Sequence, residues 1–255
     1  YTGLLARFYD ADHLWRNYCA QVQSLETFFP TLDDRLQAKV IELCCGSGSH
    51  TLEIAKMGFD VTGVDMSAEL LKIAARKLKS FKSGARVLNQ DILTSGGNSA
   101  LRNQFDAAVL LGWSLNIYPI YAKFRKILVA VHRMLKPCGI FIFDASIGNR
   151  CRAVPQRALQ YRLPDGWRGK LKIEESNRKS GNSWELLYRW QVSKNGGAPK
   201  ELTAHEKLAV VSPRDVLSEI ARTGRFRILR QARGYSLARP YQTGGRNLVI
   251  ALQKM

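Results

Sequence analysis

One glycine-containing turn, placed between two apolar runs, limits what this chain can fold into more than any other feature of its sequence. Cys44-Cys45-Gly46-Ser47-Gly48 follows the apolar run 39–43, and a second apolar run, 60–64, leads into Asp65. A strand, a glycine turn, a helix and a second strand ending in an acid are typical of folds that bind a nucleotide across the carboxyl ends of parallel strands. Glycine lets the backbone approach such a ligand because it has no Cβ. The pattern predicts an α/β fold with a nucleoside-containing cofactor at these strand ends.

The same turn limits the kind of cofactor. A dinucleotide fingerprint would carry a third glycine where Thr51 stands, and the chain has no G-x-x-x-x-G-K-[ST] phosphate loop. Asp65 is placed to accept hydrogen bonds from both hydroxyls of a ribose. The expected cofactor therefore contains a ribose but needs no phosphate cradle, a description that S-adenosylmethionine (SAM) fits.

Motifs between residues 36 and 146 resemble those of the class I SAM-dependent methyltransferases. Glu42 matches the acid that in this family contacts the methionine amino group, and Asp65 matches the ribose acid. Gln90-Asp91-Ile92 resembles the third-strand motif, whose acid accepts from the adenine amino group. The segments 105–112 and 132–144 resemble the fourth strand and the turn with the fifth strand. One departure is Cys44, which stands where the family has its first glycine.

The resemblance implies SAM as cofactor and S-adenosylhomocysteine as its product, and no metal. The residues expected to bind the cofactor lie at the strand ends and on the N-terminal segment: Tyr9, Glu42, Cys44, Gly46, Gly48, Asp65, Met66, Asp91, Ile92 and Leu111. Tyr9 is included because the N-terminal segment of similar small-molecule methyltransferases folds over SAM. The alternative for Tyr9 is packing against the sheet.

Apolar segments alternate with amphipathic helical runs, which predicts a doubly wound, mostly parallel, seven-stranded sheet with an inserted antiparallel β lid. We expect strands at 39–43, 60–64, 85–89, 107–111, 140–144, 226–230 and 246–252, and helices from Ser67 and from Pro213 to Gly224. Four parts follow: an N-terminal helical cap over the cofactor (1–35), a SAM-binding core (36–147), a lid that shapes the acceptor site (148–211), and a C-terminal helix with closing strands (212–255).

The insertion is expected to hold three strands, at 170–177, 183–193 and 202–211. Trp184, Tyr188 and Trp190 alternate on the second of these, where they line a pocket or belong to a packed core. A structural apron or a dimer contact is the alternative to a lid. In the N-terminal part, apolar residues from Leu14 to Phe29 recur at helical spacing and predict one helix before Pro30.

Composition agrees with a protein that has one core. The chain has 255 residues, 45% of them hydrophobic, and no apolar window long enough to cross a membrane. Five cysteines without C-x-x-C spacing argue against a disulfide framework and against zinc. Without a visible secretory signal, a cytoplasmic protein, monomeric or homodimeric, is expected.

Positive charge gathers in the second half of the chain. Residues 150–255 carry 22 Lys and Arg against 8 Asp and Glu, whereas residues 1–149 carry 17 against 13. Such an excess can attract an anionic small molecule or RNA, or form a solvated surface. Leu111-Gly-Trp-Ser114 stands where base-amine methylases of this class have Asn/Asp-Pro-Pro-Tyr/Phe. We therefore expect methyl transfer to N, O or C of a small molecule, which can be anionic; the alternatives are an RNA methyltransferase and a non-catalytic partner subunit with the SAM fold.

No residue is assigned as a general base from sequence. Asp144, His205, His50 and His13 are the candidates, and His50 is expected to cap its helix or line the SAM site. An amine acceptor can attack first and lose its proton afterwards, so the chemistry does not require a dedicated base.

Overall fold

The computed structural model describes residues 3–13, 16–26, 38–81, 84–117, 120–147, 159–163, 165–176, 183–235 and 247–255. Within this part of the chain, a main sheet of seven strands has the order β10-β11-β5-β4-β1-β2-β3. Its strands are β1 (Lys39–Leu43), β2 (Asp60–Asp65), β3 (Arg86–Asn89), β4 (Phe105–Leu110), β5 (Leu135–Ser146), β10 (Phe226–Arg233) and β11 (Asn247–Lys254). β11 runs antiparallel to both its neighbours, and the other described pairs are parallel. The predicted doubly wound sheet is confirmed.

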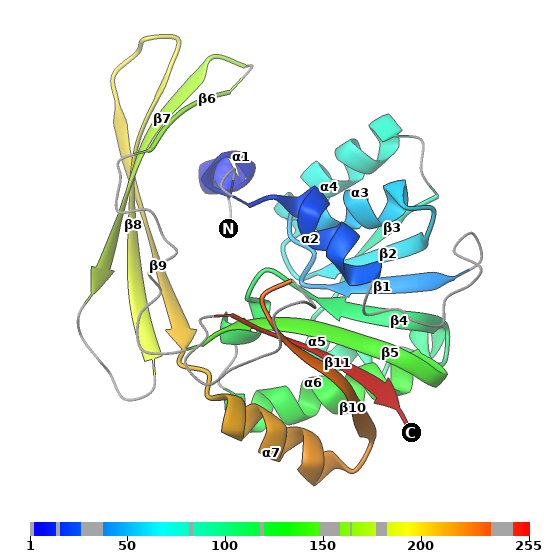
Figure 1. Cartoon of the computed structure of the whole chain (residues 1–255). Helices are drawn as coiled ribbons and strands as arrows, with labels where there is room; N and C mark the ends of the chain where they lie inside the picture. The colour runs from blue at the N-terminus through cyan, green and yellow to red at the C-terminus, as the bar shows by residue number, and fades with distance from the viewer. Residues whose placement is uncertain are drawn as a thin grey trace.

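Helices cover both faces of the main sheet (Figure 1). They are α2 (Tyr18–Leu25), α3 (Ser49–Lys56), α4 (Ala68–Phe81), α5 (Ile92–Ser95), α6 (Ile120–Met134) and α7 (Pro213–Thr223), with 3₁₀ turns η2 (Ser99–Leu101) and η3 (Ser114–Ile117). One apolar cluster joins the sheet to α5, α6 and α7, and another joins it to α2 and α3. The strands are therefore buried from both sides, as parallel sheets require.

The ends of two helices follow their sequence signals closely. The Ser67 Oγ accepts from the Leu70 N–H at 3.3 Å, as expected for an N-cap. Gly224 ends α7 in the left-handed conformation with φ 57°, whereas the Ser212 side chain makes no capping bond. In α4 the predicted apolar face is buried except at Ala75, which is exposed.

A second, antiparallel sheet is inserted between β5 and α7. In the described residues it has four strands, β6 (Leu159–Arg162), β7 (Trp167–Ser176), β8 (Ser183–Lys194) and β9 (Lys200–Ala209), in sequence order. Sequence reasoning predicted three of them and missed β6, which is only four residues long. A turn at Asn195-Gly196, with both residues at positive φ, connects β8 to β9.

Asn116, at the carboxyl side of β4, fastens the second sheet to the main one. Its Nδ2 donates to the carbonyl oxygens of Ser146 on β5, at 2.9 Å, and of Ala209 on β9, at 3.0 Å. Its Oδ1 accepts from the Ser146 N–H at 2.9 Å. Asn116 is 4% exposed, so these bonds satisfy a buried amide. They also hold the end of β9 beside β5 of the main sheet.

The N-terminal segment forms two helices, not the single helix predicted. α1 (Gly3–Asp12) and α2 are separated, and the Asn17 Oδ1 caps α2 by accepting from the Ala20 N–H at 2.9 Å. A capping Asn favours a helix start over a continuing helix. Leu14 and Phe29, two residues of the predicted pattern, lie outside the described residues.

Helix α1 lies between the two sheets (Figure 1). Phe8 is fully buried, and its ring centroid is 5.1 Å from that of Trp190 on β8. A Cβ on Gly169 of β7 would come within 2.7 Å of the Phe8 ring, so the glycine makes room for it. On its other side α1 is tied to α4, because the Lys77 Nζ donates to the Asp10 carboxylate at 2.8 Å.

The described aromatic residues of β8, Tyr188 and Trp190, belong to an apolar cluster around Phe8. Trp190 is 1% and Tyr188 8% exposed, which agrees with the packed-core alternative, while the side chain of Trp184 lies outside the described set. Among the described residues, no helix is long and apolar enough to cross a bilayer.

Replacing Phe8 by Ala should destabilise the fold by about 3–5 kcal/mol, because it removes a fully buried ring and leaves a cavity. Denaturant unfolding followed by circular dichroism measures this loss. Phe81→Ala is the matched control, since Phe81 is 44% exposed on α4. Equal effects of the two substitutions would contradict the role given to α1.

Candidate active site

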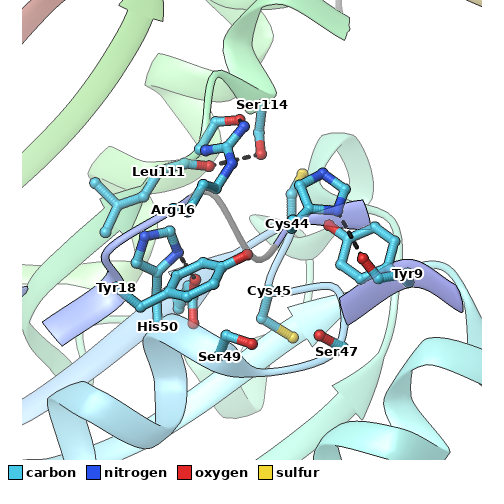
Figure 2. A pocket seen from close by; sticks show the side chains of 13 residues that line it. Tyr9, Arg16, Tyr18, Cys44, Cys45, Ser47, Ser49, His50, Leu111 and Ser114 are labelled. Carbon is cyan, nitrogen blue, oxygen red and sulfur yellow. Dashed lines mark hydrogen bonds and ion pairs between the residues drawn. The ribbon is translucent and has the colours of Figure 1, made fainter. Parts of the chain in front are cut away.

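A cavity of about 500 Å³ opens at the carboxyl ends of the main-sheet strands, between them, α1 and the second sheet. A smaller cavity of about 40 Å³ lies beside it, under α1 and α2, and Figure 2 shows its walls. The two cavities share six lining residues: Tyr9, His13, Arg16, Cys44, Gly112 and Ser114. The site is thus at the place where ligands bind in doubly wound folds, the point where the strand order reverses.

The turn after β1 has the backbone that a glycine-rich loop would have. Cys44 (φ 56°), Gly46 (φ 55°) and Gly48 (φ 75°) are all in the left-handed region. Cys44 lines both cavities, so the Cys that replaces a glycine keeps the glycine conformation, at a steric cost of roughly 1–2 kcal/mol.

The two glycines of the turn do different things. A Cβ on Gly46 would lie 2.9 Å from the Tyr9 Oη, so α1 covers the turn there. A Cβ on Gly48 would lie 2.8 Å from the Cβ of Ala74 on α4. Gly48 therefore allows close contact between helices, and it is absent from the described walls of both cavities.

Asp65, at the end of β2, is held beside this turn. Its Oδ2 accepts from the Gly46 N–H at 2.9 Å and its Oδ1 from the Ser67 N–H at 2.8 Å. Asp65 and Met66 line the large cavity, and Met66 is 70% exposed. Each carboxylate oxygen has a further lone pair, so Asp65 can accept additional hydrogen bonds.

Glu42, on β1, is buried at the wall of the small cavity with 2% exposure. The Thr51 Oγ1 donates a short hydrogen bond to it, and the His50 Nδ1 lies 3.5 Å from its Oε1. The His50 Nε2 is 2.8 Å from the Gln21 Oε1, and Tyr18 packs edge-on against the imidazole (Figure 2). His50 is thus part of a network that joins α2, α3 and β1.

The predicted adenine residues lie close to Asp65 in the sheet. The Gln90 N–H donates to the Asp65 carbonyl at 3.0 Å, and the Asp91 Oδ1 caps α5 by accepting from the Leu93 N–H at 2.9 Å. Ile92 is 2% exposed. Neither Asp91 nor Ile92 is among the described residues that line the cavities, whereas Leu111 lines the small one.

Asp144, a candidate base in the sequence, has a structural position instead. It is 1% exposed and accepts from the Gly112 and Trp113 N–H groups, at 3.1 and 2.8 Å, and from the Tyr235 hydroxyl at 2.6 Å. Burial raises its pKa. These bonds fix the turn after β4, where Trp113 has φ 64°, and Arg16 adds a bond to the Gly112 carbonyl at 2.9 Å.

The two remaining histidine candidates differ in exposure. His205 borders the large cavity, but its side chain belongs to the exposed face of β9. His13 lines both cavities, and burial, with Arg16 as a second cause, lowers its pKa to about 4. Its Nδ1 is 2.8 Å from the Tyr9 carbonyl. At neutral pH His13 is therefore uncharged and a weak base.

Several polar residues of the large cavity escaped sequence reasoning: Asp12, Arg16, Trp113 and Glu206. Glu206 carried a usable signal, because it stands at an inward position of the alternating strand Leu202–Leu208. Asp12 and Arg16 carried no usable sequence signal, because a single helix was predicted where the chain forms α1, a connection and α2.

Solved structures share this architecture over their whole length. A SAM-dependent methyltransferase from Clostridium acetobutylicum superposes with a TM-score of 0.77 at 18% identity, over 98% of this chain and 97% of that chain. CalS10, an amino pentose methyltransferase from Micromonospora echinaspora, gives 0.71 at 17% identity, over 100% and 98%. The protein has the fold of the class I SAM-dependent methyltransferases.

Sequence comparison finds a family match in one part of this fold. Residues 40–139 match the profile of the methyltransferase domain family. YqeM of Bacillus subtilis, named as a candidate methyltransferase, is 35% identical over 108 residues, 42% of each chain. The chain spans about two fifths of the length of the curated relatives it matches.

The half-buried His13, uncharged at neutral pH, makes stability depend on pH. Because its pKa is lowered from 6.5 to about 4, the unfolded chain binds a proton in this range that the folded chain does not, and stability falls as the pH drops. His13→Gln should reduce the loss of unfolding free energy between pH 7 and pH 4.5 by about 1–2 kcal/mol. Urea unfolding at the two pH values measures this. His205→Gln, at an exposed position, should leave the loss unchanged, and a parallel loss in the parent and His13→Gln would contradict the assignment.

Proposed function

We propose that the protein binds SAM across the ends of β1 and β2 and transfers its methyl group to a small molecule in the large cavity. The observation that carries this proposal is the pair of carboxylates, Glu42 and Asp65, on adjacent parallel strands at either side of the glycine turn. Leu43 and Val64 are paired in the ladder, so the two acids lie close together near the carboxyl ends of adjacent strands.

The chemistry of Glu42 fits the methionine end of SAM. Among the described side chains, no Lys or Arg forms an ion pair with this buried carboxylate, whose recorded partners are Thr51 and His50. A buried carboxylate gains from a cation, and an α-ammonium group would provide one in the adjoining small cavity.

The chemistry of Asp65 fits the ribose. Gly46 and Ser67 orient its carboxylate through backbone N–H groups, and ribose hydroxyls would use its remaining lone pairs. The exposed Met66 and the neighbouring Asp91 are proposed to bind the adenine. Cys44, Gly46 and Leu111 are proposed to contact other parts of the cofactor. Gly48 and Ile92 are proposed to support the site without contact to the cofactor.

The sulfonium of SAM supplies an already activated methyl group, so the protein needs chiefly to align the acceptor and exclude water. Tyr9 covers the glycine turn, and the second sheet closes the large cavity from the other side. Residues 1–35 are proposed to be the cap of the cofactor site and residues 148–211 its lid. A dedicated base is not required by this arrangement.

The size and charge of the cavity favour a small acceptor over RNA. About 500 Å³ is typical of a site that encloses a small ligand. Its described walls carry the carboxylates of Asp12, Asp65 and Glu206 and the guanidinium of Arg16, so these walls do not share the basic excess of the chain. This lining also disfavours the anionic acceptor considered from the composition. The fold neighbour CalS10, an amino pentose methyltransferase, supports the small-molecule class.

Transfer of labelled methyl from SAM into a fractionated extract of the source cells tests this function. Label in the small-molecule fraction, unaffected by RNase, is the expected result, and the labelled product then gives the acceptor mass. RNase-sensitive label in large RNA would establish the alternative, an RNA methyltransferase. A protein that binds SAM without any transfer would support the non-catalytic alternative.

Asp65→Ala should weaken SAM binding by about 1–3 kcal/mol, roughly 5- to 150-fold, because it removes a charge-assisted hydrogen-bond acceptor for the ribose. Isothermal titration calorimetry measures the affinity, and circular dichroism confirms that the variant is folded. Asp60→Ala, at the opposite end of β2, is the control and should bind SAM normally. Unchanged affinity in a folded Asp65→Ala protein would refute the cofactor placement.

A further inference from the structure

Glu206 interrupts an otherwise apolar row on β9. Strand residues alternate between faces, and on this strand Leu202, Ala204 and Leu208 join the apolar cluster around Phe8. Glu206 occupies the inward position between Ala204 and Leu208, whereas Thr203, His205 and Lys207 are exposed on the other face. A carboxylate in such a row is unfavourable unless something interacts with it.

Tyr188 fixes this carboxylate in place. Its hydroxyl donates to the Glu206 Oε2 at 2.7 Å, and it lies diagonally across the ladder, because β8 and β9 pair Tyr188 with Ala204 and Leu186 with Glu206. Tyr188 itself is 8% exposed. One hydroxyl uses a single lone pair of a carboxylate, so most of the acceptor capacity of Glu206 is retained.

The Glu206 carboxylate faces the large cavity. It lines the cavity together with Tyr188, Leu186 and Leu208, and none of the ion pairs recorded among the described residues includes it. Its negative charge also reaches Tyr9 above the glycine turn: burial mainly, and Glu206 to a smaller extent, raise the pKa of Tyr9 well above its usual value. Glu206 is thus on the acceptor side of the cavity and within electrostatic reach of the cofactor side.

We propose that Glu206, oriented by Tyr188, binds the amino group of the acceptor, so that the substrate is a primary or secondary amine. This proposal rests on the function proposed above and defines its acceptor. An ammonium group meets the unpaired charge of Glu206, and the apolar residues around it contact the carbon skeleton. The described walls of the cavity carry the carboxylates of Asp12 and Glu206 besides Asp65, against the guanidinium of Arg16, and this lining favours a cationic group over an anionic one on the acceptor.

The reaction balances with this residue as proton acceptor. The bound ammonium gives one proton to the Glu206 carboxylate and becomes a neutral amine. Its lone pair forms the new N–C bond to the methyl carbon while the C–S bond breaks, and the bonding pair stays on sulfur. The methylated nitrogen then carries the positive charge, and the Glu206 proton passes to water.

Three probes with one ring and different polar groups test the proposal: cyclohexylamine, cyclohexanol and cyclohexanecarboxylate. Their affinities are measured by calorimetry at pH 7.5 with the protein saturated with S-adenosylhomocysteine. The amine is expected to bind at least about 10-fold more tightly than the other two, because its ammonium group can form a charge-assisted hydrogen bond with Glu206. Equal affinities, tighter binding of the carboxylate, or no binding of the amine would overturn the proposal.

Glu206→Gln keeps the shape of the side chain and a partner for Tyr188 while it removes the charge. The variant should lose the preference for the amine, about 10-fold or more, and keep the parental affinity for cyclohexanol. Glu201→Gln is the matched control, since Glu201 lies on the same strand but on its exposed face. An amine preference that survives in Glu206→Gln refutes the assignment.

S-adenosylhomocysteine binding, measured in the same proteins, distinguishes a failure of the Glu206 assignment from a failure of the proposed methyltransferase function. The parent and Glu206→Gln should bind S-adenosylhomocysteine equally. If the parent binds none, the proposed function fails. If all three proteins bind it and the amine preference is absent, only the assignment of Glu206 fails.

Discussion

The packing of Phe8, from α1, against the second sheet is the contact on which the rest of the site depends. A helix of ten residues is too short to be stable alone and needs tertiary burial. Phe8 supplies that burial beside Trp190, and the adjacent residues Tyr9 and Asp10 then reach the glycine turn and Lys77. Three consecutive side chains thereby contact the second sheet, cover the glycine turn and tie α1 to α4.

Buried polar groups play the corresponding role at the end of β4. Asp144 binds two backbone N–H groups in a turn where Trp113 adopts an unfavourable backbone conformation, and Asn116 joins the same region to β9. Left-handed backbone at a bulky residue persists only where its surroundings enforce it. Three hydrogen bonds to the Asp144 carboxylate therefore hold the turn after β4, which lines both cavities at Gly112, while Asp144 itself is absent from their described walls.

Local signals were sufficient for the main sheet. Strand periodicity, the glycine turn and Asp65 predicted the fold and the position of the cavity correctly. The role of Gly48 depends on its contact with Ala74, and the role of Asp144 depends on its distance from Trp113; both arise only once the chain is folded. Glu206 differs, because its place in an alternating strand was visible in the sequence and only its partner Tyr188 was not.

The position of Tyr9 over Gly46 also constrains the order of events in a catalytic cycle. A cofactor bound at the turn as proposed would lie beside Tyr9 of α1, and α1 cannot move away without releasing the contact between Phe8 and the second sheet. On the proposed placement, a displacement of α1 would uncover the glycine turn and loosen the second sheet together. Turnover would then be limited by a single gate that serves both ligands, and the acceptor would meet a complete wall only after the cofactor is seated.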